Sequence, residues 1–235
     1  MLYLRVRAPF GAFRIFTAGS FRPTASFVTP SAAYGLLLNL AGIESRLDDG
    51  ESVATLTRPD LPRFEIALGA LAFPEPQSLF QQLHNYPVGK SGQENQEHET
   101  ACYGSKYNIQ PVRREFLSGI DVCLAVRGND NLEHEVRSAV ALPGASGSRY
   151  GVPFLGDNAF LVDRLDLLEV PPEAYWYKRL GAEEGGVREG LCRLTVWVDR
   201  TDASRSVAAL FYPGSDRTTT IPEEAWVEVG PSQAD

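Results

Sequence analysis

An α+β fold is predicted by the order in which apolar patterns follow one another along this chain of 235 residues. Residues 2–7 alternate apolar with polar or charged side chains, as a strand with one buried face does. Residues 30–40 then form an apolar helix that opens at a proline and ends before Gly42, a C-cap candidate. Residues 1–141 loosely fit the order strand, helix, strand, strand, helix, strand. That is the order of a ferredoxin-like, RNA-recognition-type sandwich.

The elements after the first strand follow from local composition. We expect Pro9 and Gly11 to end or interrupt that strand, and residues 21–28 to be extended or looped. Residues 63–71 alternate like a second strand, and residues 78–83 are expected to form a short helix.

The second half of the chain continues with strand patterns. Residues 85–104 are polar and contain glycines, so they are expected to form a loop, and residues 106–112 one arm of a hairpin. Residues 116–126 predict a core strand and residues 132–141 a helix. Further strands are expected at 161–170, 191–198 and 226–229. We therefore predict a domain over residues 1–160 and a β-rich C-terminal extension over residues 161–235.

Charge is distributed unevenly in this chain. The net charge of -8 argues against a general nucleic-acid binder, yet residues 1–46 carry five basic side chains and one acidic side chain. A basic surface on an acidic body suits one specific RNA. No run of about 18 apolar residues occurs, so we expect neither a membrane span nor export, and a cytoplasmic protein. The three cysteines are expected to be reduced thiols.

Metal and cofactor chemistry finds little support in the residue spacing. His84, His98 and His134 lack zinc-site spacing, and the His98 and Cys102 pair lacks a second pair of ligands. No phosphate-binding lysine motif or dinucleotide fingerprint is present. We expect no metal and no cofactor.

Arginines and aromatic residues occur together in three segments, and this combination suits phosphates and unstacked bases of single-stranded nucleic acid. They are the loop after the first strand, residues 104–114, and residues 143–156, whose four glycines could present amides to an anion. Core phenylalanines, a solvated strand face and a tight structural turn are the alternatives. The candidate RNA-binding residues are Phe13, Arg14, Ser20, Arg22, Thr24, Tyr34, Lys106, Tyr107, Arg113, Arg114, Arg149 and Tyr150.

Five segments together carry a family resemblance. They are residues 9–14 (PFGAFR), 22–24 (RPT), 29–38 (TPSAAYGLLL), 106–116 (KYNIQPVRREF) and 150–158 (YGVPFLGDN). In this order they resemble the Cas five family, RAMP-superfamily subunits of type I CRISPR surveillance complexes (Cascade). The sequence looks most like the type I-B or I-A branch, in which a separate Cas six-family enzyme cuts the precursor RNA.

The resemblance implies a ferredoxin-like domain with an inserted β-hairpin thumb, placed at residues 85–115, and a glycine-rich loop at residues 143–156. It also implies a role in antiviral defence, capping the 5′ handle of the guide RNA. The implied partners are that RNA, a Cas seven-type backbone subunit and a Cas eight-type large subunit, with target DNA reached only through the complex.

One branch of the family, from type I-C systems, cuts RNA with a Tyr, a Lys and a His. Tyr34 could stand for that tyrosine, but no lysine here has an adjacent histidine. His84 or His98 could still supply the acid and base for metal-independent cleavage. We therefore expect a non-catalytic subunit, with a metal-independent endoribonuclease for precursor RNA as the alternative. A protein-interaction scaffold with cation–π packing is a third possibility.

Overall fold

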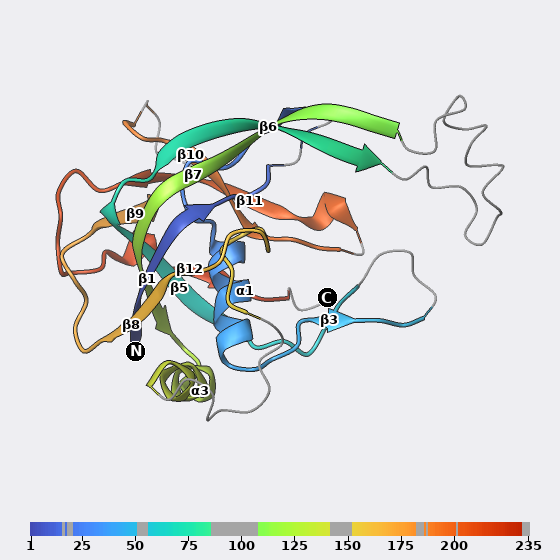
Figure 1. The fold of residues 1–235 in the computed structure, drawn as a ribbon. Helices are drawn as coiled ribbons and strands as arrows, with labels where there is room; N and C mark the ends of the chain where they lie inside the picture. The colour runs from blue at the N-terminus through green and yellow to red at the C-terminus, as the bar shows by residue number, and fades with distance from the viewer. Residues whose placement is uncertain are drawn as a thin grey trace.

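The computed structural model describes residues 1–15, 17, 21–50, 56–85, 108–141, 152–181, 186, 188–200 and 202–231; the side chains of 83–85, 108–110 and 203 are not described. Within these residues ten strands form one mostly antiparallel sheet, and two α-helices pack together on one of its faces (Figure 1). The expected α+β class is therefore confirmed. No helix among the described residues combines the length and apolar character needed to cross a bilayer.

The main path of the sheet has seven strands. In spatial order they are β10 (Cys192–Trp197), β11 (Val207–Pro213), β9 (Tyr175–Arg179), β5 (Phe64–Ala72), β7 (Asn108–Arg127), β1 (Leu2–Gly11) and β8 (Arg164–Leu168). Three strands pair beside this path: β12 (Val227–Val229) with β5, and both β2 (Phe21–Arg22) and β6 (Glu75–Asn85) with β7. β3 (Arg46–Leu47) and β4 (Leu56–Thr57) form a separate ribbon. Short 3₁₀ turns lie at Ala203–Arg205 and Glu223–Ala225.

The helices begin and end where the local sequence satisfies their backbone groups. α1 (Pro30–Leu40) matches the expected bounds; the Thr29 hydroxyl accepts from the amide of Ala32 at 3.2 Å. At the other end Gly42 has a φ of 71°, and the amides of Gly42 and Ile43 donate to carbonyls of the last turn. α3 (Asp130–Ala141) is capped by the Asn129 side chain, which accepts from the amide of Leu132 at 3.0 Å.

The main core lies between the sheet and the helices. Leu2, Leu4 and Val6 alternate along β1 and are fully buried against it, as the pattern predicts. Arg5 and Arg7, between them on the other face, form ion pairs with Asp121 at 2.6 Å and Asp166 at 3.1 Å. The strands expected at 63–71, 116–126, 161–170, 191–198 and 226–229 are also observed, as β5, β7, β8, β10 and β12.

Two expectations about local structure are wrong. Residues 78–83 are not helical but lie in β6, because every residue from Glu75 to Asn85 pairs with β7. The first strand is also not ended by Pro9; it continues to Gly11, the other residue expected to end it. The carbonyl of Arg7 accepts from the amide of Asp163, so the backbone groups of Arg7 face β8. Pro9, two residues later, faces the same edge of the strand, but the pairing with β8 has already ended there. A missing amide costs no sheet hydrogen bond there.

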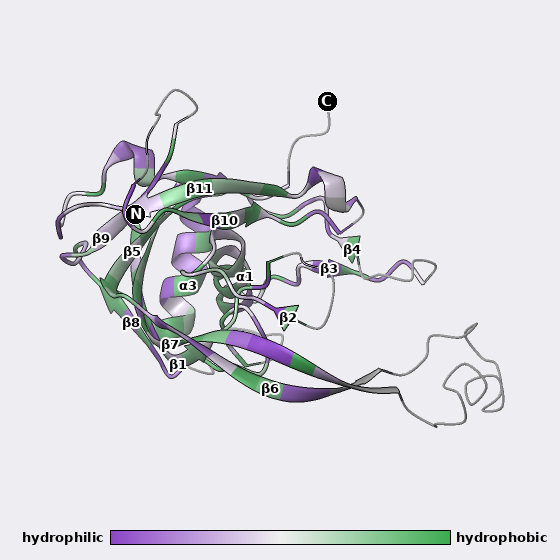
Figure 2. Cartoon of the chain, turned by 90° about the horizontal axis from the view of Figure 1, so that it is seen from above, coloured by the Kyte–Doolittle hydropathy of each residue, from purple (hydrophilic) through white to green (hydrophobic). Residues whose placement is uncertain are grey.

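β6 and β7 form a long hairpin that extends away from the body of the protein (Figure 2). β7 has 20 residues: its C-terminal half lies between β1 and β5, and its N-terminal half is an arm of the hairpin. Gly119 marks the junction with a φ of 69°. Residues 86–107, most of the segment expected to form the thumb, lie outside the described residues. The division at residue 160 stays a prediction, since described strands on both sides of it belong to one sheet.

Gly156 lies where the chain passes close to the end of β1. Its φ is 79°, and a Cβ on it would lie 2.2 Å from the carbonyl oxygen of Ala12. We expect Gly156→Ala to lower the free energy of unfolding by at least about 2 kcal/mol, because both the left-handed backbone and the contact become unfavourable. Urea denaturation measures this.

Gly35→Ala is the matched control for that substitution. Gly35 lies inside α1. A Cβ there would have no atom within 4 Å beyond its two chain neighbours and the backbone of the helix itself. The control should raise the stability by about 0.5–1 kcal/mol, because alanine favours helix. Equal effects of the two substitutions would contradict the proposed close approach at Gly156.

Candidate nucleic-acid interface

Asp157 joins three segments that are far apart in the sequence. Its carboxylate lies 3.3 Å from Nη2 of Arg14, which follows β1, and 2.6 Å from Nη2 of Arg114 in β7. The Asp157 side chain is 8% exposed, and its other oxygen accepts from the amide of Ala159 at 3.0 Å. The Arg114 contact is an ion pair rather than a well-aligned hydrogen bond. This carboxylate anchors the root of the hairpin to the body.

β2 brings Arg22 to the hairpin root, beside two arginines of β7. It pairs in parallel with β7, so that Phe21 lies beside Arg113 and Arg22 beside Arg114. We call Arg14, Arg22, Arg113 and Arg114 the arginine cluster.

Thr24 holds the chain on either side of β2 in position. Its hydroxyl accepts from the amide of Phe13 at 2.8 Å, and its own amide donates to Glu115 of β7 at 3.4 Å. The amide of Ala25 donates to the carbonyl of Phe13 at 2.8 Å. Thr24 therefore acts in the described contacts by positioning the loop that carries Arg14 and Arg22.

An aromatic and cationic row crosses one face of the hairpin. Phe21, Arg113 and Phe80 are register partners on β2, β7 and β6, so their side chains share a face. The Arg113 guanidinium lies 5.6 Å from the centre of the Phe21 ring. Phe80 is 82% exposed and Phe21 is 42% exposed. Exposed rings beside a cation are suited to stacking on unpaired bases.

The opposite face contains a second aromatic group. The rings of Phe10, Phe116 and Phe160 lie 5.4 to 6.3 Å apart, and the Arg114 guanidinium lies 5.0 Å from the centre of the Phe160 ring. Arg114 is only 15% exposed, so Asp157 and Phe160 enclose most of its charge.

The two remaining members of the arginine cluster, Arg22 and Arg113, are not held by a carboxylate. Arg113 is exposed and donates to the Ser78 hydroxyl at 3.4 Å, while Arg22 is half-buried. Neither forms an ion pair with an acidic residue that the structure describes. Arg22 and Arg113 are therefore the members of the cluster best placed to bind an anion from outside.

Two candidate residues are placed in the core. Phe13 is buried, and Tyr34 is buried against Phe64 and Trp197, with ring centres 5.2 and 5.6 Å away. The Tyr34 hydroxyl donates to the carbonyl of Pro62 at 3.0 Å, and burial raises the pKa of this phenol. These placements do not favour direct stacking of either ring on RNA.

The remaining candidates, Ser20, Lys106, Tyr107, Arg149 and Tyr150, lie outside the described residues. Sequence reasoning missed Asp157 and Phe80. A glycine followed by an acid, inside an otherwise basic and aromatic motif, was the available signal for Asp157. Phe80 was hidden by the helix expected at 78–83. Among the described residues no three acidic, histidine or cysteine side chains gather as a metal site would require.

Comparison with known proteins establishes the fold but no family. No family model matches this sequence, and no curated protein matches it. A chain of a solved structure described as a "CRISPR RNA-guided surveillance complex" is similar, with a TM-score of 0.51, 15% identity and 95% coverage of both chains. A second, "Crystal structure of Cas protein", has a TM-score of 0.46, 17% identity and coverage of 98% and 99%. The chain thus shares its fold with a component of such a complex.

Asp157→Asn should destabilise the protein more than loss of its exposed partner, Arg14. The substitution leaves the enclosed Arg114 guanidinium without a counter-charge, so we expect a loss of about 2–3 kcal/mol in the free energy of unfolding. Arg14→Ala should cost less than about 1 kcal/mol, because Arg14 is 69% exposed and solvent screens its pair. Urea denaturation compares them.

Asp60→Asn is the control for that comparison, since Asp60 forms an exposed ion pair with Arg58. No measurable change in stability is expected there. If Asp157→Asn behaved like the control, Asp157 would not anchor the hairpin.

Proposed function

We propose that this protein is a non-catalytic subunit of a CRISPR surveillance complex that binds guide RNA through the arginine cluster. The observation that carries the proposal is the meeting of four arginines and two exposed phenylalanines at the hairpin root of a chain with a net charge of -8. Cations for phosphates beside rings for bases are what a single-stranded RNA requires.

The topology of the sheet supports a more specific proposal, that this subunit is a ferredoxin-like protein of the Cas five family. The strands β8, β1, β7 and β5 are neighbours in that order and antiparallel, with α1 and α3 packed on one face. Along the chain these elements follow the β-α-β-β-α-β order of that fold. The likeness to a chain of a CRISPR RNA-guided surveillance complex over 95% of both chains agrees with it.

Within this proposal the hairpin is the thumb, and the RNA segment it binds is the 5′ handle, which the protein caps. Arg22 and Arg113 bind phosphates, and Phe80 and Phe21 stack on bases. The partners are guide RNA, a Cas seven-type backbone subunit and a Cas eight-type large subunit, with target DNA contacted through the complex in antiviral defence. The type I-B or I-A branch is part of this proposal.

The position of Tyr34 supports a non-catalytic role. An acid or base for RNA cleavage must reach the 2′-hydroxyl or the leaving oxygen. Tyr34 is buried, and its hydroxyl is already bonded to the carbonyl of Pro62. The alternative, a metal-independent endoribonuclease, then depends on His84 or His98.

Reversal of Arg22 and Arg113 to Glu should weaken RNA binding without changing the melting temperature. If about five phosphates are neutralised, the slope of log affinity against log salt is about -3.5 for a single strand, and it should fall to about -2 in the double variant. Titration of a handle-length RNA at several salt concentrations measures the slope.

Reversal of Arg188 and Arg193 gives a control with the same net charge. Both side chains are exposed and lie outside the arginine cluster. An equal loss of affinity in this control would mean that overall charge, rather than the hairpin root, binds the RNA. An RNA affinity of the wild-type protein that does not change with salt concentration would contradict the proposal.

Purified protein should not cleave repeat RNA, either in EDTA or with magnesium, and gel analysis of end-labelled RNA tests this. His84→Ala and His98→Ala variants are the controls. Cleavage at one defined position that disappears in either variant would instead establish the endoribonuclease alternative.

A further inference from the structure

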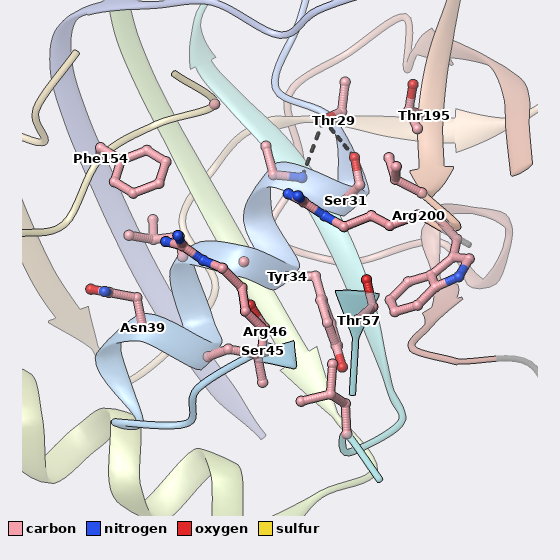
Figure 3. A pocket seen from close by; sticks show the side chains of 18 of the residues that line it. Thr29, Ser31, Tyr34, Asn39, Ser45, Arg46, Thr57, Phe154, Thr195 and Arg200 are labelled. Atoms are coloured by element: carbon pink, nitrogen blue, oxygen red, sulfur yellow. Dashed lines mark hydrogen bonds between the residues drawn. The ribbon is translucent and has the colours of Figure 1, made fainter. Parts of the chain in front are cut away.

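A cavity of about 510 Å³ opens beside α1, on the helix side of the sheet (Figure 3). Its walls come from α1, the segment 43–46, Thr57, the segment around Phe154 and the end of β10 with residues up to 200. This volume is in the range of pockets that bind small organic ligands. Arg14 lines the cavity as well as belonging to the arginine cluster, so the two sites are continuous.

α1 turns small and polar side chains toward this cavity. Ser31, Gly35 and Asn39 are four residues apart, so they lie on one stripe of the helix, and all three line the cavity. Most of the other α1 side chains are buried in the core. The stripe leaves room for a ligand and offers an amide and a hydroxyl as hydrogen-bonding groups.

Two guanidinium groups converge on the cavity from separate elements. Figure 3 shows Arg46, from β3, and Arg200, from the segment after β10, each extending across α1. Arg46 lies 3.8 Å from Glu44, the single acidic residue among the described cavity residues. Arg200 is exposed and forms no ion pair with any described residue. Arg46 lies near Glu44 and Arg14 is paired with Asp157, so Arg200 contributes the positive charge that attracts an anion to the cavity.

The remaining lining is suited to the sugar and base of a nucleotide. The Trp197 ring is half-buried and lines the cavity next to Tyr34. The hydroxyls of Thr29 and Ser31 are 3.2 Å apart, and Thr57 and Thr195 add two more. An inorganic anion would use only the guanidinium groups and leave most of this volume empty.

We propose that this cavity binds a single nucleotide, with its phosphate held by Arg46 and Arg200 and its base against Trp197. The nucleotide is either free or one unit of an RNA strand that continues onto the arginine cluster past Arg14. Only the second case rests on the proposed RNA-binding function.

Calorimetric titration of the full chain with AMP, adenosine and inorganic phosphate tests the proposal. We expect AMP to bind at least about tenfold more tightly than either fragment, because phosphate and nucleoside contacts act together. Arg46→Ala and Arg200→Ala should each weaken AMP binding at least about tenfold, the loss expected for a charge-assisted hydrogen bond. Arg188→Ala, outside the cavity, should bind AMP normally. Equal binding of phosphate and AMP, or no effect of either cavity substitution, would overturn the proposal.

Competition between AMP and a handle-length RNA distinguishes the two sources. Displacement of AMP by RNA supports a strand unit in the cavity, and simultaneous binding supports a free nucleotide. If AMP binds but wild-type protein does not bind RNA, the proposed function fails and the cavity assignment stands. If RNA binds, AMP does not, and Arg46→Ala and Arg200→Ala leave RNA affinity unchanged, the cavity assignment fails and the proposed function stands.

Discussion

The carboxylate of Asp157 is the contact on which the geometry of the hairpin root depends. It is 8% exposed and neutralises Arg114, itself 15% exposed, as well as the more exposed Arg14. An enclosed guanidinium without a counter-charge is costly, so this contact holds the end of β1, β7 and the segment after Gly156 together. Gly156 makes it possible, because only glycine tolerates that φ so near the carbonyl of Ala12.

This anchoring divides the arginines into two groups with different roles. Arg5 and Arg7 on the sheet face opposite the helices, and Arg114 at the hairpin root, are paired with carboxylates. They position strands and add little net positive potential. Arg22 and Arg113 have no acidic partner among the described residues, and Arg113 lies beside the exposed ring of Phe21. In a chain of net charge -8, Arg22 and Arg113 thus leave positive charge at the hairpin root, and Arg200 leaves it at the cavity beside α1.

The positions of these arginines affect which nucleic acids the protein can bind. An acidic body repels polyanions in general, so in the proposed function an RNA gains its affinity at the few places where cations and rings coincide. The hairpin places Phe80 and Arg113 on one face through a strand pairing, which sets their spacing rigidly. Arg14 lines the cavity and is paired with Asp157 at the hairpin root, so it connects these two places.

Local elements were determined by the sequence alone, because their signals lie within a few residues. The capped apolar run predicted α1 with its bounds, and period-two alternation predicted β1 with Leu2, Leu4 and Val6 inside. Residues 78–83 were mispredicted because their backbone bonds go to β7, whose paired residues lie far away in the sequence, from Glu115 for Ser78 to Gln110 for Leu83. Residue type likewise identified Phe13, Tyr34, Arg22 and Arg114 as candidates, but only the tertiary structure decided their exposure and pairing. Burial and ion pairing depend on partners distant in sequence, such as Asp157 for Arg114, which no local pattern specifies.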